Sequence, residues 1–246
     1  MILREAGYEV CRFTKPSEVD GVDVVIVLGG DGAILHSALY AACKDVKIIG
    51  INYGNLGFLT EYEKDERSQV VELLERIKDG SCRILRRSLL QLDVAGKTYF
   101  ALNEIALQRD SGVTGLKTTQ ILRLEVTTKE GPDKISGDGV LICTPTGSTA
   151  YSLSAGGAIL MPEVPVFMLT PICAFSMRAR PTVYSDSDTF TIRVTKGSSV
   201  LLADGIPVAN LSENAEVRIK KAPFTADFPV RENLDFFDKV RNKLSE

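Results

Sequence analysis

A short apolar run that ends in a glycine-rich loop constrains this chain more than any other feature. The run covers residues 22–28, the loop is Gly29-Gly30-Asp31-Gly32, and apolar residues then recur at helical spacing over residues 33–42. The β-branched residues of the run predict a buried strand. The N-terminus of the following helix offers backbone N–H groups without a side chain in the way, which suits a phosphate group. The sequence therefore predicts a strand–loop–helix unit that can bind phosphate.

Asp31 does not fit a simple phosphate site. Its carboxylate repels a phosphate group unless a metal ion lies between them, or unless the carboxylate is there to accept a proton. The structural alternative is that Asp31 caps the helix, since aspartate is a preferred N-cap residue. The loop alone leaves both interpretations open.

Composition places the chain among ordinary soluble globular proteins. It has 246 residues, 44% of them hydrophobic and 25% charged, with a net charge of −3 that gives no electrostatic footprint for nucleic acid. Apolar runs are too short to span a membrane and no signal peptide opens the chain, so we expect a cytoplasmic protein without a nucleic-acid or membrane partner. Five scattered cysteines predict buried free thiols in a reducing compartment. We interpret Arg83, Arg86 and Arg87 as a solvated cluster.

A single histidine, His36, excludes a metal site built from several histidines. The chain contains no P-loop lysine motif, so it is not a Walker-type kinase. Leu35 stands at the last position of the dinucleotide fingerprint G-x-G-x-x-G, which argues against an ordinary Rossmann dehydrogenase.

The chain changes character near residue 87. Before it, a second buried strand over 46–52 and an amphipathic helix over 66–78 predict an α/β domain with a parallel sheet. After it, period-two alternation with regular turns predicts antiparallel strands. We therefore expect an α/β domain of residues 1–87, without the usual first strand and joined by the tail 228–246, and a β-rich domain of residues 88–227. Within the tail, helical spacing over 232–244 predicts a helix that packs back onto the body.

Three polar clusters follow or precede predicted strands. They are Asn103-Glu104, Gly137-Asp138-Gly139, and the uncharged block of residues 144–157, which surrounds one tyrosine with hydroxyls and glycines. Such a block suits a polar, partly planar ligand such as a nucleotide. The structural alternatives are a strand-end polar pair, a turn, and a helix cap followed by a face of small residues.

Taken in order, these motifs resemble the NAD kinase family. The resemblance runs through most of the chain and rests on residues 29–32, 50–52, 54–59, 103–104, 137–139, 144–157 and 170–173. The GGDG element alone is also similar to lipid kinases of the diacylglycerol and sphingosine type. The block of residues 144–157, together with Asn103-Glu104, is far more specific.

The resemblance implies phosphorylation of the 2′-hydroxyl on the adenosine ribose of NAD. ATP or polyphosphate would be the donor, a divalent cation such as Mg²⁺ would assist, and a homodimer or homotetramer is expected. Asp31 matches the group that acts as the base or orients the hydroxyl, and no protein side chain is assigned as a metal ligand. Residues matched to substrate binding are Gly29, Gly30, Gly32, His36, Phe58, Asn103, Glu104, Asp138, Thr146, Thr149, Ala150, Tyr151, Ser152, Leu153 and Ser154.

The chain departs from the family pattern at a few positions. Ala33 replaces a usual threonine, Ser136 replaces an arginine or a bulkier residue, and residues 174–177 lack a histidine that is commonly present. Ala33 and the missing first strand motivate one alternative to the kinase hypothesis, a catalytically weak NAD(P)-binding regulatory module. The GGDG loop motivates the other, a lipid kinase that shares this loop.

Overall fold

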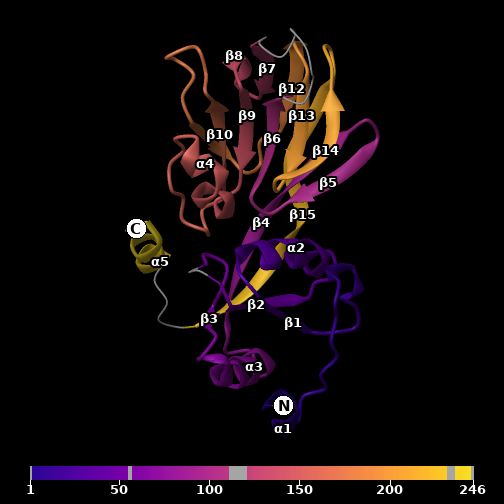
Figure 1. Cartoon of the computed structure of the whole chain (residues 1–246), viewed down its shortest axis with the longest axis vertical. Coiled ribbons are helices and arrows are strands. Elements are labelled where there is room, and N and C mark those ends of the chain that lie inside the picture. Colours follow the sequence, from indigo (N-terminus) through magenta and orange to yellow (C-terminus); the bar gives the residue numbers. More distant parts are fainter. Residues whose placement is uncertain (1, 55–56, 111–120, 232–235, 245–246) are drawn as a thin grey trace. The chain divides into compact units, whose positions relative to one another are not determined.

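The computed structural model describes residues 2–54, 57–110, 121–231 and 236–244 (Figure 1). The chain divides into two compact units, residues 1–87 with 224–246, and residues 88–223. The domain limits expected from the sequence remain a prediction, because compactness does not establish that a part folds independently.

A short parallel sheet forms the centre of the first unit. Strands β1 (Val24–Leu28), β2 (Lys47–Asn52) and β3 (Tyr62–Glu63) pair in that order, and both pairings are parallel. Helix α2 (Asp31–Ala42) connects β1 to β2, and helix α3 (Val70–Lys78) follows β3 through the 3₁₀ turn η2 (Arg67–Gln69). Apolar residues of β2 and α3 pack into one core, because the helix has a strongly apolar face. The predicted parallel α/β arrangement is confirmed.

The N-terminal segment of this unit carries two short helical elements, α1 (Ile2–Glu5) and the 3₁₀ turn η1 (Pro16–Glu18). Gly7 follows α1 with a φ of 86°, a left-handed conformation that suits glycine after a helix.

The second unit contains the antiparallel strands. The described residues form two six-stranded sheets, with strand orders β11-β10-β9-β6-β13-β14 and β5-β4-β15-β12-β7-β8. Alternate apolar side chains of both sheets pack into one large core, as the period-two pattern predicted. The strands are β4 (Arg83–Val94), β5 (Lys97–Ala101), β6 (Glu104–Arg109), β7 (Leu122–Thr128), β8 (Gly131–Gly137), β9 (Gly139–Cys143), β10 (Val166–Ile172), β11 (Thr182–Ser185), β12 (Phe190–Lys196), β13 (Ser199–Ala203), β14 (Ile206–Leu211) and β15 (Glu216–Val230).

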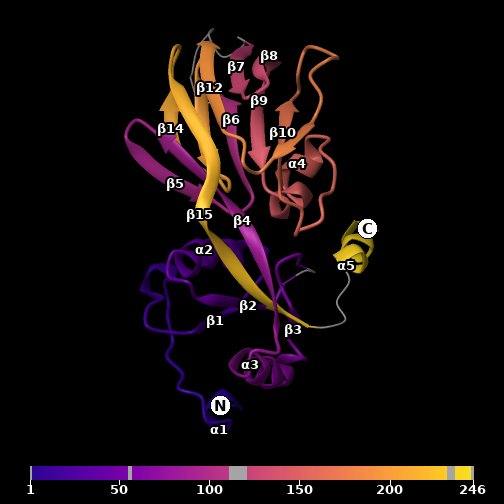
Figure 2. The same ribbon diagram turned by 180° about the vertical axis from the view of Figure 1, so that it is seen from behind.

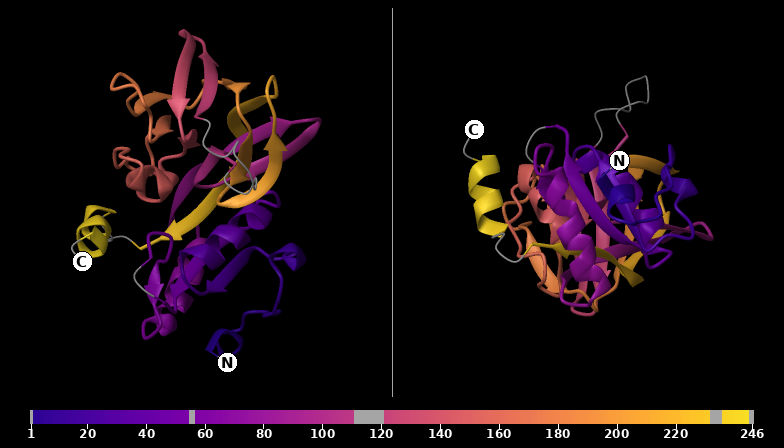
Figure 3. Two further views of the ribbon diagram at one scale, coloured as in Figure 1. Left: turned by 45° about the horizontal axis from the view of Figure 1, so that its top comes forward. Right: turned by 90° about the horizontal axis from the view of Figure 1, so that it is seen from below.

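Among the described residues of the second unit, two helical turns interrupt the strands. The 3₁₀ turn η4 (Thr146–Thr149) and the short helix α4 (Tyr151–Ser154) follow β9 directly. Residues of this segment pack against apolar residues of β9 and β10. Figures 1 and 3 show the ribbon of this segment beside these strands. The block of residues 144–157 is therefore a helical connection laid on one sheet.

Strands β4 and β15 are long and each begins in one unit and ends in the other (Figure 2). The interpretation of the arginine cluster on β4 as solvated is wrong for Arg87. Arg87 is only 7% exposed, and its guanidinium lies 5.2 Å from the ring centre of Phe228 on β15. A guanidinium stacks well on an aromatic face, so this pairing compensates for its burial. Arg83 and Arg86 are exposed, as expected.

The five cysteines are all free, and they differ in exposure. Cys143 is buried and Cys82 is half-buried, whereas Cys11, Cys43 and Cys173 are exposed. The expectation of buried thiols is therefore wrong for these last three. Among the described helices, none is long and apolar enough to cross a membrane.

The C-terminal helix α5 (Phe236–Leu244) belongs to the first unit. Lys239 Nζ donates a hydrogen bond of 2.7 Å to the Thr60 carbonyl oxygen and lies 3.5 Å from the Glu61 carboxylate. Val240 is 8% exposed, whereas Phe237 is 44% exposed. The predicted terminal helix is confirmed, although its expected first residues, 232–235, lie outside the described part of the chain.

Candidate functional site

The Asp31 carboxylate is held by a loop distant in sequence. Gly30 is the N-cap of α2 and Asp31 is the first helical residue, so Asp31 does not cap its own helix. Instead, Oδ2 accepts a hydrogen bond of 2.8 Å from the Phe58 N–H, and Oδ1 accepts one of 2.9 Å from the Leu59 N–H. The capping interpretation is therefore wrong. The carboxylate joins the β1–α2 loop to the loop that follows β2.

Glycines make this close approach possible. A Cβ atom at Gly57 would collide with Asp31 Oδ1 and would lie 2.9 Å from Thr60 Oγ1. A Cβ atom at Gly50 would collide with the Ile34 side chain and would lie 3.0 Å from the Leu59 carbonyl oxygen. A side chain at position 57 would therefore displace the bound Asp31 carboxylate, whereas one at position 50 would displace the end of the Ile34 side chain and press on the backbone of residues 59 and 60.

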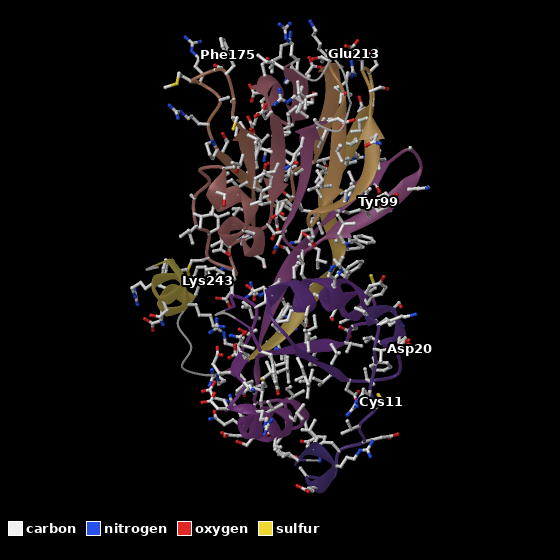
Figure 4. All side chains as sticks on the ribbon, viewed as in Figure 1. Cys11, Asp20, Tyr99, Phe175, Glu213 and Lys243 are labelled. Carbon is white, nitrogen blue, oxygen red and sulfur yellow. The ribbon has the colours of Figure 1, made fainter. Side chains whose placement is uncertain are left out.

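Lys243 of α5 also contacts Asp31. Its Nζ lies 3.2 Å from Asp31 Oδ2 and 4.4 Å from the centre of the Phe58 ring. Lys243 is labelled on α5 in Figure 4. Phe58 itself is 9% exposed, and its ring centre lies 6.5 Å from that of Phe236. Sequence reasoning assigned the tail only a packing role and missed this ammonium group. No spacing pattern points to it, because the two partners are 212 positions apart.

The remaining predicted residues of the first unit lie around the N-terminus of α2. The Gly29 N–H donates to the Ile51 carbonyl oxygen at 3.0 Å, and the Gly30 carbonyl oxygen accepts from Ala33 and Ile34. Gly32 is exposed, as is His36 on the next turn of the helix. The loop backbone is thus anchored to β2, while the start of the helix lies at the surface.

In the second unit, an aspartate organises the Asn103-Glu104 pair. The Asp204 carboxylate accepts hydrogen bonds from the backbone N–H groups of Leu102 (2.8 Å), Asn103 (2.8 Å) and Glu104 (3.0 Å). Sequence reasoning did not single out Asp204. It lies about a hundred residues along the chain from the pair that it anchors, and only the pairing of β6 with β13 brings them together.

Glu104 is a buried carboxyl group, and one of its oxygens has no partner in the part of the chain that the structure describes. The residue is 7% exposed, and Oε2 has no hydrogen-bond partner among the described residues. Burial, followed by the neighbouring charge of Asp204, raises the pKa of Glu104 to about 7. A buried polar atom of this kind requires an explanation, and a ligand donor is one.

The block of residues 144–157 also contacts the backbone of Leu102 and Asn103. Thr144 Oγ1 donates to the Leu102 carbonyl oxygen at 2.6 Å and accepts from the Gly147 N–H at 3.1 Å. A Cβ atom at Gly147 would collide with the backbone of Asn103. The strand end, the threonine and the glycine therefore form one rigid corner.

Several hydroxyls of this block are used internally. Ser152 Oγ is fully buried and lies 2.9 Å from Thr170 Oγ1, whereas Ser148 Oγ donates to the Pro145 carbonyl oxygen at 2.7 Å and accepts from the Leu160 N–H at 3.0 Å. Thr149 Oγ1 donates to the Thr146 carbonyl oxygen at 3.3 Å. For these groups the structural alternative holds, because each hydroxyl stabilises the connection itself.

Other predicted residues of the block reach the surface of the unit. Thr149, Ala150, Tyr151 and Leu153 are partly exposed, and Ser154 is exposed, whereas Thr146 is buried. Burial raises the pKa of the Tyr151 phenol, while a hydrogen bond with Gln108 acts in the opposite direction. This face therefore offers an aromatic ring with a fixed polar edge.

Asp138 lies between β8 and β9, where the Arg109 guanidinium is 3.2 Å from its Oδ1. The Asp138 side chain is 46% exposed, so the ion pair is screened by solvent. Gly137, which precedes it, leaves no room for a side chain beside the carbonyl oxygens of Ile172 and Cys173, each 2.8 Å from an added Cβ atom.

These features define a class of protein. One unit supplies a glycine loop with a fixed carboxylate, and the other supplies a neutral, partly aromatic surface beside a buried acid. Phosphoryl transfer to an organic hydroxyl requires a base or orienting group and a site for a nucleotide. The chain has the features of a nucleotide-dependent phosphotransferase.

Comparisons with known proteins make the class specific. Residues 4–81 match the family described as the ATP-NAD kinase N-terminal domain, and residues 102–229 match the ATP-NAD kinase C-terminal domain. An NAD kinase of Carboxydothermus hydrogenoformans is 36% identical over 96% of this chain and 85% of its own length. An NAD kinase of Methanothermobacter thermautotrophicus is 35% identical over 99% of this chain and 81% of its own length.

Solved structures agree with the sequence relatives. The yeast NADH kinase complexed with NADH matches with a TM-score of 0.81 at 26% identity, over 91% of this chain and 67% of that one. An NAD kinase from Archaeoglobus fulgidus in complex with ATP matches with a TM-score of 0.80 at 29% identity, over 98% of this chain and 92% of that one. The chain therefore belongs to the NAD kinase family, and membership assigns it NAD kinase activity, the conversion of NAD to NADP with ATP.

Proposed function

We propose that Asp31 orients the 2′-hydroxyl of the adenosine ribose of NAD and accepts its proton during phosphoryl transfer from ATP. One observation carries this proposal: the carboxylate is held by the N–H groups of Phe58 and Leu59 and does not cap α2. A carboxylate accepts about four hydrogen bonds. The contacts with Phe58, Leu59 and Lys243 leave room for a substrate hydroxyl.

The second unit is proposed to bind the dinucleotide. Glu104 supports this role, because its buried Oε2 lacks a partner among the described residues and a ribose hydroxyl or amide N–H of a ligand would supply one. The surface formed by residues 149–154 supplies polar backbone groups and the Tyr151 ring. We propose the same role for Asn103, Asp138 and Thr146, and for Ser152 a role in holding the block in shape.

Gly29, Gly30 and Gly32 are proposed to face the phosphates of the donor, which is ATP or, alternatively, polyphosphate, with His36 and Phe58 close by. A divalent cation such as Mg²⁺ fits this arrangement. The described residues contain no group of three acidic, histidine or cysteine side chains that could hold a metal. Mg²⁺ commonly keeps several waters and binds substrate phosphates, so the proposal assigns it no side-chain ligand. When bound, the cation would neutralise phosphate charge.

Two wider proposals accompany the reaction. A homodimer or homotetramer is proposed on the strength of the family pattern. A cytoplasmic location is proposed because all five cysteines are free, which fits a reducing compartment.

Substitution Asp31→Asn tests the central role. It keeps the size of the side chain but removes its ability to accept a proton, so we expect kcat to fall by several orders of magnitude while the Kd for NAD changes little. NADP formed from NAD, ATP and Mg²⁺ is detected with an NADP-specific dehydrogenase, and NAD binding is measured by calorimetry. Asp133→Asn, at an exposed position, is the matched control. Near-normal kcat in the Asp31 variant would show that the assigned role is wrong.

A further inference from the structure

Three residues on one face of helix α5 contact the loop that follows β2 and the Asp31 carboxylate. Phe236, Lys239 and Lys243 follow one another at helical spacing, so their side chains lie on the same side of the helix. Phe236 packs near the Phe58 ring, Lys239 binds the Thr60 carbonyl oxygen, and Lys243 reaches the Asp31 carboxylate. The helix is thereby anchored along its length to residues 58–60 and ends at the catalytic side chain.

Two contacts define the position of the Lys243 ammonium group. It lies 3.2 Å from Asp31 Oδ2 and 4.4 Å from the centre of the Phe58 ring, a cation–π distance. Phe58 also donates its backbone N–H to the same oxygen at 2.8 Å. Two donors from different parts of the unit thus converge on Oδ2, and they oppose rotation of the carboxylate.

We propose that Lys243 is a positioning residue for phosphoryl transfer: α5 holds its ammonium group on Asp31 Oδ2, so that the remaining lone pair of Oδ1, beside the one that accepts the Leu59 N–H, faces the substrate hydroxyl. This inference rests on the proposed role of Asp31. The chain lacks the P-loop lysine of other nucleotide kinases. Here the ammonium group comes from the C-terminal helix and acts on the carboxylate that handles the acceptor.

A purely structural role for Lys243 makes a different prediction. The contacts of Phe236 and Lys239 would still hold α5 in place, and kcat would not depend on the Lys243 ammonium. A positioning role makes kcat depend on it, because a displacement of about 1 Å at a reacting group can cost roughly a hundredfold in rate.

The test uses Lys243→Met, which keeps an unbranched side chain one atom shorter and removes its charge, and Lys243→Arg, which keeps the charge. We expect Lys243→Met to lower kcat about 10- to 100-fold with the KM for NAD and ATP within about twofold, and Lys243→Arg to recover most of the loss. Lys78→Met, at an exposed position of the same unit, is the control and should behave as wild type. Thermal unfolding verifies the fold, and Lys243→Gln replaces the methionine variant if that variant unfolds at the assay temperature.

The double variant Asp31→Asn/Lys243→Met tests whether the lysine acts through the aspartate. If it does, the double variant should be no slower than Asp31→Asn alone. Unchanged kcat in Lys243→Met, or a further loss on the Asp31→Asn background, would overturn the inference. Full activity in Asp31→Asn itself would instead overturn the proposed function, so the two failures are distinguishable.

Discussion

Substitution Gly57→Ala tests whether steric room beside Asp31 is required for catalysis. The added Cβ atom would collide with Asp31 Oδ1, and it would also lie 2.9 Å from Thr60 Oγ1. The carboxylate cannot simply move aside, because the N–H groups of Phe58 and Leu59 hold its two oxygens at 2.8 and 2.9 Å. Either the carboxylate rotates and loses one of these bonds, or the loop after β2 shifts.

The structure sets the expected magnitudes. A hydrogen bond to a charged group contributes about 1.5–3 kcal/mol, and since the Asp31 side chain is 31% exposed, water recovers part of a lost bond. The free energy of unfolding should therefore fall by about 1–2 kcal/mol, or roughly 2–8 °C in Tm. A shift of about 1 Å in the carboxylate should lower kcat about a hundredfold, which corresponds to about 3 kcal/mol in the activation barrier.

Gly54→Ala is the matched control from the same loop. Its added Cβ atom would meet Asn52 Oδ1 at 3.9 Å, an ordinary van der Waals contact, so we expect kcat within about twofold of wild type. Coupled detection of NADP gives kcat, and a thermal scan gives Tm. Gly57→Ala with more than half of the wild-type kcat and an unchanged Tm would refute the steric argument.

Two further predictions concern the buried acid of the second unit. Burial raises the pKa of Glu104 from 4.5 to about 7. Between these two pH values the folded protein keeps a proton that the unfolded chain releases, so the free energy of unfolding falls as the pH rises from 4.5 to 7, by up to about 3 kcal/mol. Glu104→Gln should remove that fall; urea unfolding at pH 4.5 and pH 8 checks it, and parallel profiles for the variant and wild type would contradict it. Asp204→Asn keeps a residue type that tolerates the φ of 47°, but it replaces one carboxylate oxygen by an NH₂ group, which cannot accept a hydrogen bond from the Leu102 N–H. We therefore expect a loss of about 2–4 kcal/mol in urea unfolding and, with the charge of Asp204 removed, a lower pKa for Glu104. A variant as stable as wild type would show that the Asp204 carboxylate does not anchor this strand.

Local patterns predicted the elements that carry the site. The apolar run before Gly29 became β1, and the helical spacing after it became α2, since both signals depend only on neighbouring residues. Alternating residues after residue 87 likewise became antiparallel strands, because burial of one sheet face imposes a period of two. The glycine loop and the uncharged block were also recognisable from the sequence, because each consists of contiguous residues.

Other features depend on partners that no local pattern names. The sequence offered capping for Asp31, whereas the tertiary structure gives its carboxylate to the N–H groups of residues 58 and 59. The sequence predicts a solvated charge at Arg87, whereas in the structure β15 places the Phe228 ring against its guanidinium. Hydroxyls that suggested a ligand surface, such as those of Ser148 and Ser152, turn inward because nearby carbonyl and hydroxyl groups satisfy them.

By itself, the sequence determined the family and the two kinds of sheet, because each is expressed in short motifs and periodicities, and it predicted which residues bind substrates. Only the tertiary structure decided what surrounds those residues. It placed Lys243 on Asp31 across 212 positions and the Asp204 carboxylate on the backbone of Asn103-Glu104, and it buried Glu104 with one oxygen that has no partner in the described part of the chain. The physical reason is that electrostatics and hydrogen bonding act over a few ångströms of space, whatever the separation along the chain.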